Sequence, residues 1–265
     1  MARSLAGRRV LLTGASSGIG RCLAERIARK GARLIVSARS ADKLDELTAR
    51  LKVSGEVLAV PADVTSAEDR QQLLETAQVR FGGLDVLINN AGVASFGHFT
   101  GGTEAILRQV MEVNFFAPAE LTRSAIPLLR NGEQPAIVNV ASMCGRCGLP
   151  AWSEYSASKF ALVGLAEALR AEMARYDIDV LTVLPGLTNT DLGRHLLRNE
   201  GRMKLDYSKG MSPDAVADAI LAAIEKNRAE TVLGEARWML RVKRWFPGLL
   251  NRLMTRKVGQ LYAHS

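Results

Sequence analysis

The stretch of sequence that decides the fold is Val10–Gly20, which reads VLLTGASSGIG. It begins as a short strand-like run, and three glycines then break that run before a helical pattern continues to Lys30. Glycine permits a tight turn and lets the backbone approach a pyrophosphate, which the free N–H groups of the following helix can hold. An ordinary strand-to-helix turn can also be rich in glycine, but the flanking strand and helix favour a dinucleotide-binding turn. The residues of this expected turn are Gly14, Ser16, Ser17, Gly18, Ile19 and Gly20.

Beyond this turn, short β-branched and leucine-rich runs alternate with longer helical patterns. Most of the short runs are apolar throughout, as in parallel strands that helices cover on both faces. The expected strands are residues 9–13, 33–37, 57–60, 86–89, 136–141, 179–184 and 231–234. Long helices are expected over 103–129 and 153–176, with Ser66 and Ser212 as N-caps of two others. The expected fold is α/β: a Rossmann-like, doubly wound parallel sheet of about seven strands.

Length and composition fit one globular unit. The chain has 265 residues, and its 48% hydrophobic and 23% charged residues exclude a disordered or fibrous protein. We expect a catalytic domain over 1–234, with a substrate lid at about 187–211, and an amphipathic helical extension over 235–265. The sequence shows neither a signal peptide nor an apolar run of the roughly 18 residues that a membrane span needs. Three cysteines are too few for a disulfide framework, so the expected compartment is the cytoplasm.

The positive charge is concentrated in the C-terminal extension. Residues 235–265 hold seven basic residues and one acidic residue, which leaves a net charge of +2 for the rest. A nucleic-acid partner is therefore not expected. The extension carries Trp238 and Trp245 among apolar residues at helical spacing. Such a basic amphipathic segment can lie on an anionic membrane, or it can dock on the domain or on a second subunit. Docking is the more common of these outcomes. We therefore expect docking here, with weak membrane contact at most.

The coenzyme preference depends on the end of the second expected strand. NAD-binding sites hold the ribose 2′-hydroxyl with a carboxylate at this position, but here the chain reads VSARS over 36–40. Arg39 can instead bind a 2′-phosphate, with Ser37 or Ser40 as a further donor. The alternative is that Arg39 is a solvated side chain in a surface loop. The pattern favours NADP(H) over NAD(H).

Tyr155 and Lys159 lie four residues apart in an expected helix, so their side chains share one face. A free tyrosine titrates at about pH 10, and acid–base work near neutrality requires positive charge that lowers its pKa. The Lys159 ammonium and a cationic nicotinamide can together supply that charge. The same spacing is common on helix surfaces, so the pair alone does not establish a catalytic role.

Taken together, the motifs resemble those of the short-chain dehydrogenase/reductase family in order and approximate spacing. The resemblance covers residues 6–234. It rests on TGASSGIG at 13–20, NNAG at 89–92, Asn114, Ser142, Tyr155 with Lys159, and Pro185-Gly186. It implies that Tyr155 is the catalytic acid/base and that Ser142 hydrogen-bonds the substrate oxygen. It also implies that Lys159 holds the nicotinamide ribose and lowers the tyrosine pKa, and that Asn114 anchors a water of the proton relay.

The resemblance also implies the rest of the cofactor surface. It places Asp63 and Val64 beside the adenine, and Asn90, Ala91 and Gly92 under the adenosine ribose. At the nicotinamide carboxamide and phosphates it places Pro185, Gly186, Thr188 and Thr190. A basic residue at the position of Arg39 goes with NADP in this family, although Ser17 stands where one subgroup has a second basic residue. Family members form dimers or tetramers through the two long helices, so a homodimer or homotetramer is expected.

The function expected from these features is hydride transfer between NADP(H) and a carbonyl or secondary alcohol. An apolar set around the expected substrate site favours a hydrophobic ketone or aldehyde, although these side chains can also simply pack on the body. Its members are Phe96, Phe99, Leu149, Trp152, Leu192, Leu196, Leu197, Met203 and Tyr207. One alternative is a reductase of 3-oxoacyl-carrier or long-chain 3-keto lipid substrates. For that alternative the residues that can meet an acidic carrier are Arg194, Arg198, Arg202 and Lys204.

Two further alternatives concern chemistry of another class. A non-catalytic NADP-binding scaffold or redox sensor would keep the fold without turnover, and the intact set of catalytic-type residues argues against it. Cys144 and Cys147 form a C-x-x-C pair, but two cysteines cannot close a zinc site and the surroundings are not thioredoxin-like. Structural or substrate-loop thiols are favoured. The three histidines do not have ligand spacing, so no metal site is expected.

Overall fold

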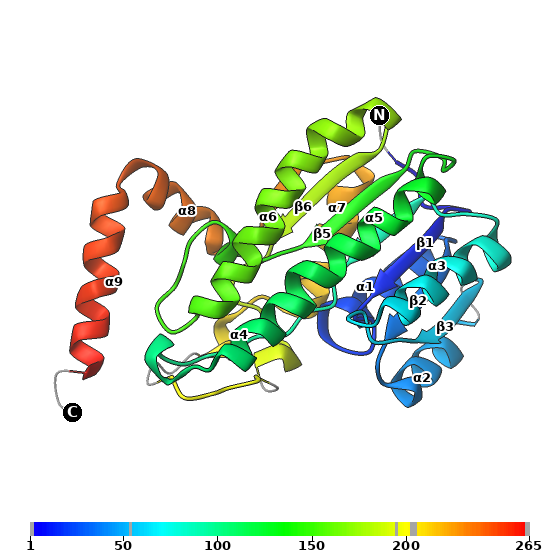
Figure 1. The fold of residues 1–265 in the computed structure, drawn as a ribbon. Helices are drawn as coiled ribbons and strands as arrows, with labels where there is room; N and C mark the ends of the chain where they lie inside the picture. The colour runs from blue at the N-terminus through cyan, green and yellow to red at the C-terminus, as the bar shows by residue number, and fades with distance from the viewer. Residues whose placement is uncertain (1–2, 53–54, 194–195, 202–205, 263–265) are drawn as a thin grey trace.

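The computed structural model of the chain describes residues 3–52, 55–193, 196–201 and 206–262. Seven parallel strands form one sheet in the order β3-β2-β1-β4-β5-β6-β7 (Figure 1). The strands are β1 Arg9–Thr13, β2 Arg33–Ala38, β3 Val57–Pro61, β4 Val86–Asn89, β5 Ala136–Val140, β6 Asp179–Leu184 and β7 Glu230–Val232. The strand order reverses between β1 and β4, and in doubly wound sheets ligands bind at the carboxyl ends beside that reversal. The predicted fold class is confirmed.

Helices cover both faces of the sheet. They are α1 Gly18–Arg29, α2 Ala41–Leu51, α3 Ala67–Phe81, α4 Glu104–Met111, α5 Ala117–Leu129, α6 Ser153–Met173, α7 Pro213–Glu225, α8 Ala236–Trp245 and α9 Pro247–Tyr262. Successive side chains of a strand point to opposite faces. Accordingly, Val10 and Leu12 of β1 pack with α1 and α7, whereas Leu11 packs with α3 and α5. This two-sided burial explains why the strands read as continuous apolar runs.

The ends of several helices follow the predicted signals. The Ser66 hydroxyl accepts a hydrogen bond from the Asp69 backbone N–H, and Ser212 caps α7 in the same way through Ala215. Gly82 ends α3 with a φ of +74°, a conformation that favours glycine. The expected continuous helix over 103–129 is wrong in one respect. A π-helical turn, Glu112–Phe116, separates α4 from α5.

The C-terminal extension is only partly docked. The inner side of α8 packs on the body through Ala236, Met239 and Leu240, and the Lys243 ammonium donates to the Arg146 carbonyl. The following helix, α9, extends away from the sheet (Figure 1). Docking on the domain was expected for the whole extension, but it holds for the inner side of α8 and not for its tryptophan-bearing side. In the described part of the chain, no helix is both long and apolar enough to cross a membrane.

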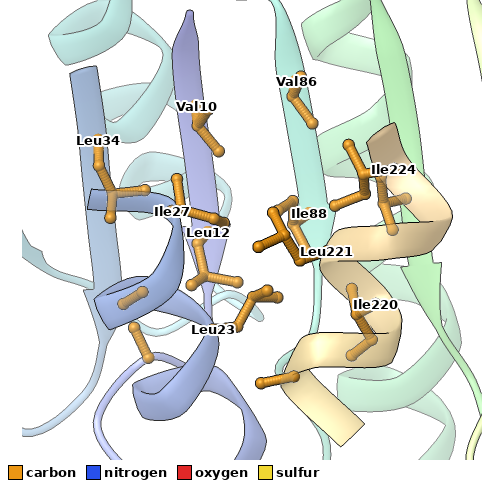
Figure 2. Packing of buried hydrophobic residues seen from close by; sticks show 14 of the residues in the cluster. Val10, Leu12, Leu23, Ile27, Leu34, Val86, Ile88, Ile220, Leu221 and Ile224 are labelled. Atoms are coloured by element: carbon orange, nitrogen blue, oxygen red, sulfur yellow. The ribbon is translucent and has the colours of Figure 1, made fainter. Parts of the chain in front are cut away.

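Large side chains of α1 and α7 belong to one buried cluster over the sheet, and Figure 2 shows members from both helices, among them Leu23 and Ile220, together with Leu12 and Ile88 of the strands. Ile220 is fully buried. We predict that Ile220→Ala lowers the free energy of unfolding by about 2–5 kcal/mol, because the surroundings cannot fill the cavity left behind. Urea denaturation should show a lower midpoint with an unchanged slope.

The matched control for Ile220→Ala is Val79→Ala. Val79 lies on α3 and is 80% exposed, so its truncation should change stability by at most about 0.5 kcal/mol. A loss at Ile220 no larger than at Val79 would show that α7 is not part of the cooperative core.

Candidate active site

A large cleft lies at the carboxyl ends of the strands. It has a volume of about 1670 Å³ and is lined by the glycine turn, by the ends of β2 to β6, and by α4, α6 and α9. The predicted site residues that line it are Gly14, Ser16, Ser17, Gly18, Ile19, Gly20, Arg39, Asp63, Val64, Asn90, Ala91, Gly92, Ser142, Tyr155, Lys159, Pro185, Gly186, Thr188 and Thr190. The structure therefore brings these residues together around one space. The remaining one, Asn114, is buried and contacts the segment that follows β4.

The glycine turn is clamped by the segment after β4. Asn90 donates its side-chain amide to the carbonyls of Thr13 and Gly14, both at 3.0 Å. The Thr13 hydroxyl accepts from the backbone N–H groups of Asn90 and Ala91, both at 3.1 Å. A Cβ on Gly20 would lie 2.0 Å from the Gly14 carbonyl oxygen, and one on Gly14 would lie 2.7 Å from the Ala91 Cα. Only glycine permits this close approach at both positions.

The start of α1 is suited to an anion. Ser17, at the N-cap, does not bond the first turn through its side chain, and that turn carries no acidic residue. Its N–H groups and the positive end of the helix dipole therefore face the cleft. Gly14 and Gly18 have φ values of +68° and +51°, a region that favours glycine, and the turn exposes backbone rather than side chains there. This cradle fits a pyrophosphate.

Two cations and one carboxylate surround the cleft end at β2 and β3. Arg39 is exposed after β2, and Lys43, four residues later in the first turn of α2, lines the same space. Asp63 accepts hydrogen bonds from the Thr65 backbone and hydroxyl at 2.9 and 2.7 Å. Partial burial opposes ionisation of Asp63, but these bonds and nearby Arg39 hold its pKa below its usual value. Lys43 was missed from the sequence, because Arg39 precedes α2 and the i+4 spacing therefore does not place the two side chains on one helix face.

The opposite end of the cleft holds the predicted catalytic groups. Tyr155 and Lys159 lie on α6, and the Lys159 ammonium is 5.8 Å from the centre of the Tyr155 ring. Lys159 donates to the Val140 carbonyl at 3.3 Å. The Ser142 hydroxyl oxygen, directly after β5, accepts from the Cys144 backbone N–H at 3.1 Å. The Ser142 O–H proton is therefore available to donate toward the cleft.

Asn114 lies in the π-helical turn, and its side chain faces α6. Its amide exchanges hydrogen bonds with the Val93 backbone, at 2.9 Å to the N–H and 2.8 Å to the carbonyl. A third bond, at 3.0 Å, goes to Ser158. A Cβ on Gly92 would lie 3.1 Å from the Asn114 Oδ1 and 3.6 Å from the Lys159 ammonium. The missing side chain of Gly92 leaves room for both groups.

Burial controls the protonation of the catalytic pair. It raises the pKa of Tyr155 above its ordinary value of 10, although a hydrogen bond with Ser142 acts in the opposite direction. It lowers the pKa of Lys159 to about 8. The sequence argument expected Lys159 to lower the tyrosine pKa. Within the chain itself desolvation is the larger effect, because both groups are almost fully removed from water.

The expected substrate region is apolar, but its composition differs from the prediction. Leu149, Trp152, Leu192, Leu196 and Tyr207 line the cleft as expected. Phe96 instead contacts Trp152, with ring centres 5.0 Å apart. Exposed Phe99 and half-buried Leu197 lie outside the lining. Met203 falls outside the described residues. The prediction missed apolar residues contributed by α4 and α9. They are Leu107, Met111, Leu250, Leu253, Met254 and Val258.

A buried ion pair holds the segment that carries Arg198 against the start of α6. The Arg198 guanidinium lies 3.2 Å from Glu154 and donates to the His98 carbonyl at 2.9 Å. Both charged side chains are nearly inaccessible. Arg198 therefore holds three chain segments beside the substrate region, and it is unavailable to an acidic carrier, contrary to the role considered for it. Arg194, Arg202 and Lys204 lie outside the described residues.

The C-x-x-C pair shows no sign of redox or metal chemistry. Cys144 and Cys147 are free and buried, and burial raises the pKa of the Cys144 thiol to about 11. A thiol that stays protonated is a poor nucleophile and a poor metal ligand. Among the described residues no group of histidine, cysteine and acidic side chains could hold a metal ion. The interpretation as structural thiols agrees with this burial.

Comparison with known proteins assigns the family. A family model described as short chain dehydrogenase matches residues 8–201. The chain belongs to this family. The uncharacterized oxidoreductase YxnA of Bacillus subtilis is 36% identical to this short-chain dehydrogenase over 92% of this chain and 70% of its own length.

Two solved structures extend the comparison to three dimensions. One is a short-chain dehydrogenase/reductase from Burkholderia phymatum in complex with NAD, with a TM-score of 0.84 and 26% identity over 93% of this chain and 96% of that one. The other is a short-chain dehydrogenase from Burkholderia cenocepacia in complex with NADP, with a TM-score of 0.80 and 27% identity over 95% and 99%. This chain is therefore a member of an oxidoreductase family with the Rossmann-like fold.

The buried Lys159 gives a prediction for stability. Its pKa of about 8 in the fold lies below the ordinary 10.5, so the unfolded chain binds this proton more tightly. Below pH 8 the buried ammonium costs up to about 3 kcal/mol, at about 1.36 kcal/mol per pKa unit. The cost disappears as pH rises from 8 towards 10.5, because the folded amine becomes neutral. Lys159→Met should therefore raise the melting temperature near pH 7 and lose this advantage near pH 10.

Thermal unfolding at both pH values, monitored by circular dichroism, measures this difference. A shift in melting temperature that is the same at both pH values would contradict the buried charge at Lys159.

Proposed function

We propose that this protein is an NADP(H)-dependent oxidoreductase that transfers a hydride between the nicotinamide and a hydrophobic carbonyl compound or secondary alcohol. The observation that carries the proposal is the arrangement of one cleft. Tyr155, Ser142 and Lys159 line one end of it, and the N-terminus of α1 with Arg39 and Lys43 lines the other. A dinucleotide has a reactive ring at one end and phosphates along its length, so it matches this distribution of groups.

The cleft fits a dinucleotide in both size and chemistry. The turn from Gly14 to Gly20 brings backbone close to the cleft, as a pyrophosphate requires. Asp63 and Val64 would lie beside the adenine, and Asn90 to Gly92 under its ribose. Pro185, Gly186, Thr188 and Thr190 would meet the nicotinamide end. The coenzyme, when bound, supplies or accepts the hydride.

In the direction of reduction, the chain must deliver one proton to the carbonyl oxygen as the hydride reaches its carbon. Tyr155 donates that proton, because its raised pKa keeps the phenol protonated until the oxygen becomes basic. The Ser142 hydroxyl donates a hydrogen bond to the same oxygen. In oxidation the steps run in reverse, and Tyr155 as a phenolate accepts the alcohol proton.

Lys159 and Asn114 support the charge changes at Tyr155. The Lys159 ammonium, 5.8 Å from the phenol ring, stabilises the phenolate that remains after proton donation, and it is placed to hold the nicotinamide ribose. Its pKa of about 8 lets it exchange protons near neutral pH. Asn114 is bonded to Val93 and Ser158, and we propose that it holds a water of the relay that returns the proton.

The preference for NADP(H) is supported by two cations rather than one. Arg39 and Lys43 line the end of the cleft where the adenosine ribose would lie. A guanidinium can bind a 2′-phosphate with two hydrogen bonds, and an ammonium adds a second positive charge. No carboxylate replaces them at the end of β2. Asp63, the nearby acid, already accepts two bonds from Thr65.

The proposed substrate is a hydrophobic ketone or aldehyde, since the cleft is apolar between the catalytic groups and α9. A long-chain 3-keto lipid fits the same apolar space and remains an alternative. A carrier-linked 3-oxoacyl group is less favoured because the buried Arg198 cannot serve an acidic carrier. Consumption of NADPH with ketones, aldehydes, long-chain 3-keto compounds and carrier-linked oxoacyl groups would distinguish these substrates.

Other properties of the protein remain proposals. The intact Asn114, Ser142, Tyr155 and Lys159 support an enzyme over a non-catalytic scaffold or redox sensor. We propose a catalytic unit over 1–234 with the extension 235–265, assembled as a homodimer or homotetramer through the long helices. The free cysteines support a reducing compartment, the cytoplasm.

The acid/base role predicts that Tyr155→Phe reduces kcat/KM to less than about a tenth, a loss of at least about 1.4 kcal/mol. Only the hydroxyl is removed, so the melting temperature and the dissociation constant for NADPH should stay close to those of the wild type. The control is Tyr176→Phe, because Tyr176 lies outside the cleft beneath the guanidinium of Arg130. Turnover that survives in the Tyr155 variant would exclude this tyrosine as the acid.

The coenzyme assignment predicts different effects on the two nucleotides. Arg39→Ala should raise the dissociation constant for NADPH by about 10- to 150-fold, the range for a charge-assisted hydrogen bond, and should leave that for NADH unchanged. Lys43→Ala should have a smaller effect of the same kind. Lys52→Ala removes one charge from the exposed far end of the same segment and is the control. Fluorescence titration measures the dissociation constants of all four proteins for both nucleotides, and equal affinity of the wild type for NADH and NADPH would overturn the assignment.

A further inference from the structure

The outer side of α8 presents two tryptophans to solvent. Met239 and Leu240 face the body, whereas Trp238 and Trp245 lie at i and i+7 on the opposite side, where they are 63% and 71% exposed. Arg241 is exposed between them. Large aromatic side chains of a helix normally pack on the body, and here the packing uses smaller residues of the same helix. The tryptophans therefore contribute little to the fold.

The exposed apolar surface continues around the turn into α9. Phe246, Leu249 and Leu253 are each more than half exposed. Within the described residues ten large hydrophobic side chains are exposed, and five of them lie on these two helices or, for Phe246, in the turn between them. Figure 1 shows the pair at one side of the molecule, with α9 apart from the layers around the sheet. Such clustering indicates an interaction surface.

The charge of the same segment has one sign. Residues 236–265 contain seven lysine and arginine residues and no acidic residue. Arg241 and Arg244 are exposed next to the tryptophans, and the Arg244 guanidinium lies 5.8 Å from the centre of the Trp245 ring. Tryptophan beside arginine on a helix lying parallel to a bilayer matches the boundary between headgroups and acyl chains.

We propose that α8 and α9 form a peripheral binding surface for an anionic lipid bilayer. Trp238, Trp245 and Phe246 would enter the boundary between headgroups and acyl chains. The arginines beside them would bind lipid phosphates. The described helices cannot span the bilayer, so the contact is reversible and depends on both the aromatic and the basic side chains.

Charge favours a bilayer over a second copy of the chain. In a two-fold symmetric contact each α8 would meet the same surface of its partner, so Arg241 and Arg244 would face like charges with no acid in either segment. Such juxtaposition is strongly unfavourable. The remainder of the chain carries nearly balanced charge and offers no overall complement, whereas an anionic leaflet does.

Flotation with phosphatidylcholine vesicles that contain about 30 mol% phosphatidylserine tests the proposal, since each basic residue near such a surface contributes about 1 kcal/mol. The intact protein should bind these vesicles, bind pure phosphatidylcholine much less, and be released by salt. Arg241→Gln with Arg244→Gln should weaken binding by about 10- to 30-fold. Trp238→Ser with Trp245→Ser should remove most of it.

The matched control is Arg29→Gln with Arg80→Gln, which removes two exposed charges from α1 and α3. It should bind vesicles like the wild type. The melting temperatures of all three double variants should stay unchanged because these side chains are exposed. The tryptophan emission of the wild type should shift to shorter wavelength on binding, and the shift should be much smaller in the Trp238 and Trp245 variant.

Several results would overturn the proposal. One is the failure of the intact protein to bind anionic vesicles, and another is equal weakening in the control variant. A third is a combination of two observations: the wild type is an oligomer that does not bind vesicles, and the Trp238 and Trp245 variant is dissociated in sedimentation velocity without lipid. That result would assign the surface to a second copy of the chain. Vesicle binding requires neither coenzyme nor substrate, so these outcomes are independent of the proposed reaction.

Discussion

The close approach between the glycine turn and Asn90 is the constraint on which the cleft depends. Gly20 lies against the Gly14 carbonyl with no room for a side chain, and Asn90 bonds the Thr13 and Gly14 carbonyls. Together these contacts fix the N-terminus of α1 against the end of β4. The same segment continues to Gly92, beside which Asn114 and Lys159 are placed. One local packing arrangement thus relates the end of the cleft proposed to bind phosphate to the end proposed to be catalytic.

The end of the cleft that holds Tyr155 and Lys159 has a cost in stability. Tyr155 and Lys159 are almost completely removed from water, and desolvation disfavours the charged form of each. A buried ammonium at neutral pH costs free energy that a methionine in its place would not. The fold tolerates this cost because the surrounding sheet and helices bury a large apolar core. Functional sites commonly carry such destabilising features.

The sequence was sufficient for the sheet because the central strands are buried on both faces. Arg9–Thr13, Val86–Asn89 and Asp179–Leu184 agree with the predicted strands to the residue. The last strand was placed one residue late at its start and two residues late at its end, because Gly234 (φ +64°) was assigned to the strand although it belongs to the following turn. The π-helical turn was missed, since five residues are too few to change an apolar periodicity that α4 and α5 share.

The candidate site was predictable where only one residue type fits the local backbone, as at Gly14 and Gly20 of the glycine turn. Lys43 was not predicted because a lysine on a helix surface is ordinary, and only its position beside the cleft distinguishes it. The orientation of α8 was beyond the sequence for a different reason. Its apolar residues occupy most of the helix circumference, so the pattern did not show that Met239 and Leu240 would face the body and the tryptophans would not.

The residues that α9 contributes to the wall of the cleft are not part of the main hydrophobic core. Leu250, Met254 and Val258 line the space, yet they lie on a helix that adds nothing to the two principal core clusters. Substitutions there would change the size and shape of the cleft, while the sheet and the proposed proton donor Tyr155 stay intact. The C-terminal helix is therefore the part of this scaffold where the shape of the cleft can change during evolution with the smallest loss in the free energy of unfolding.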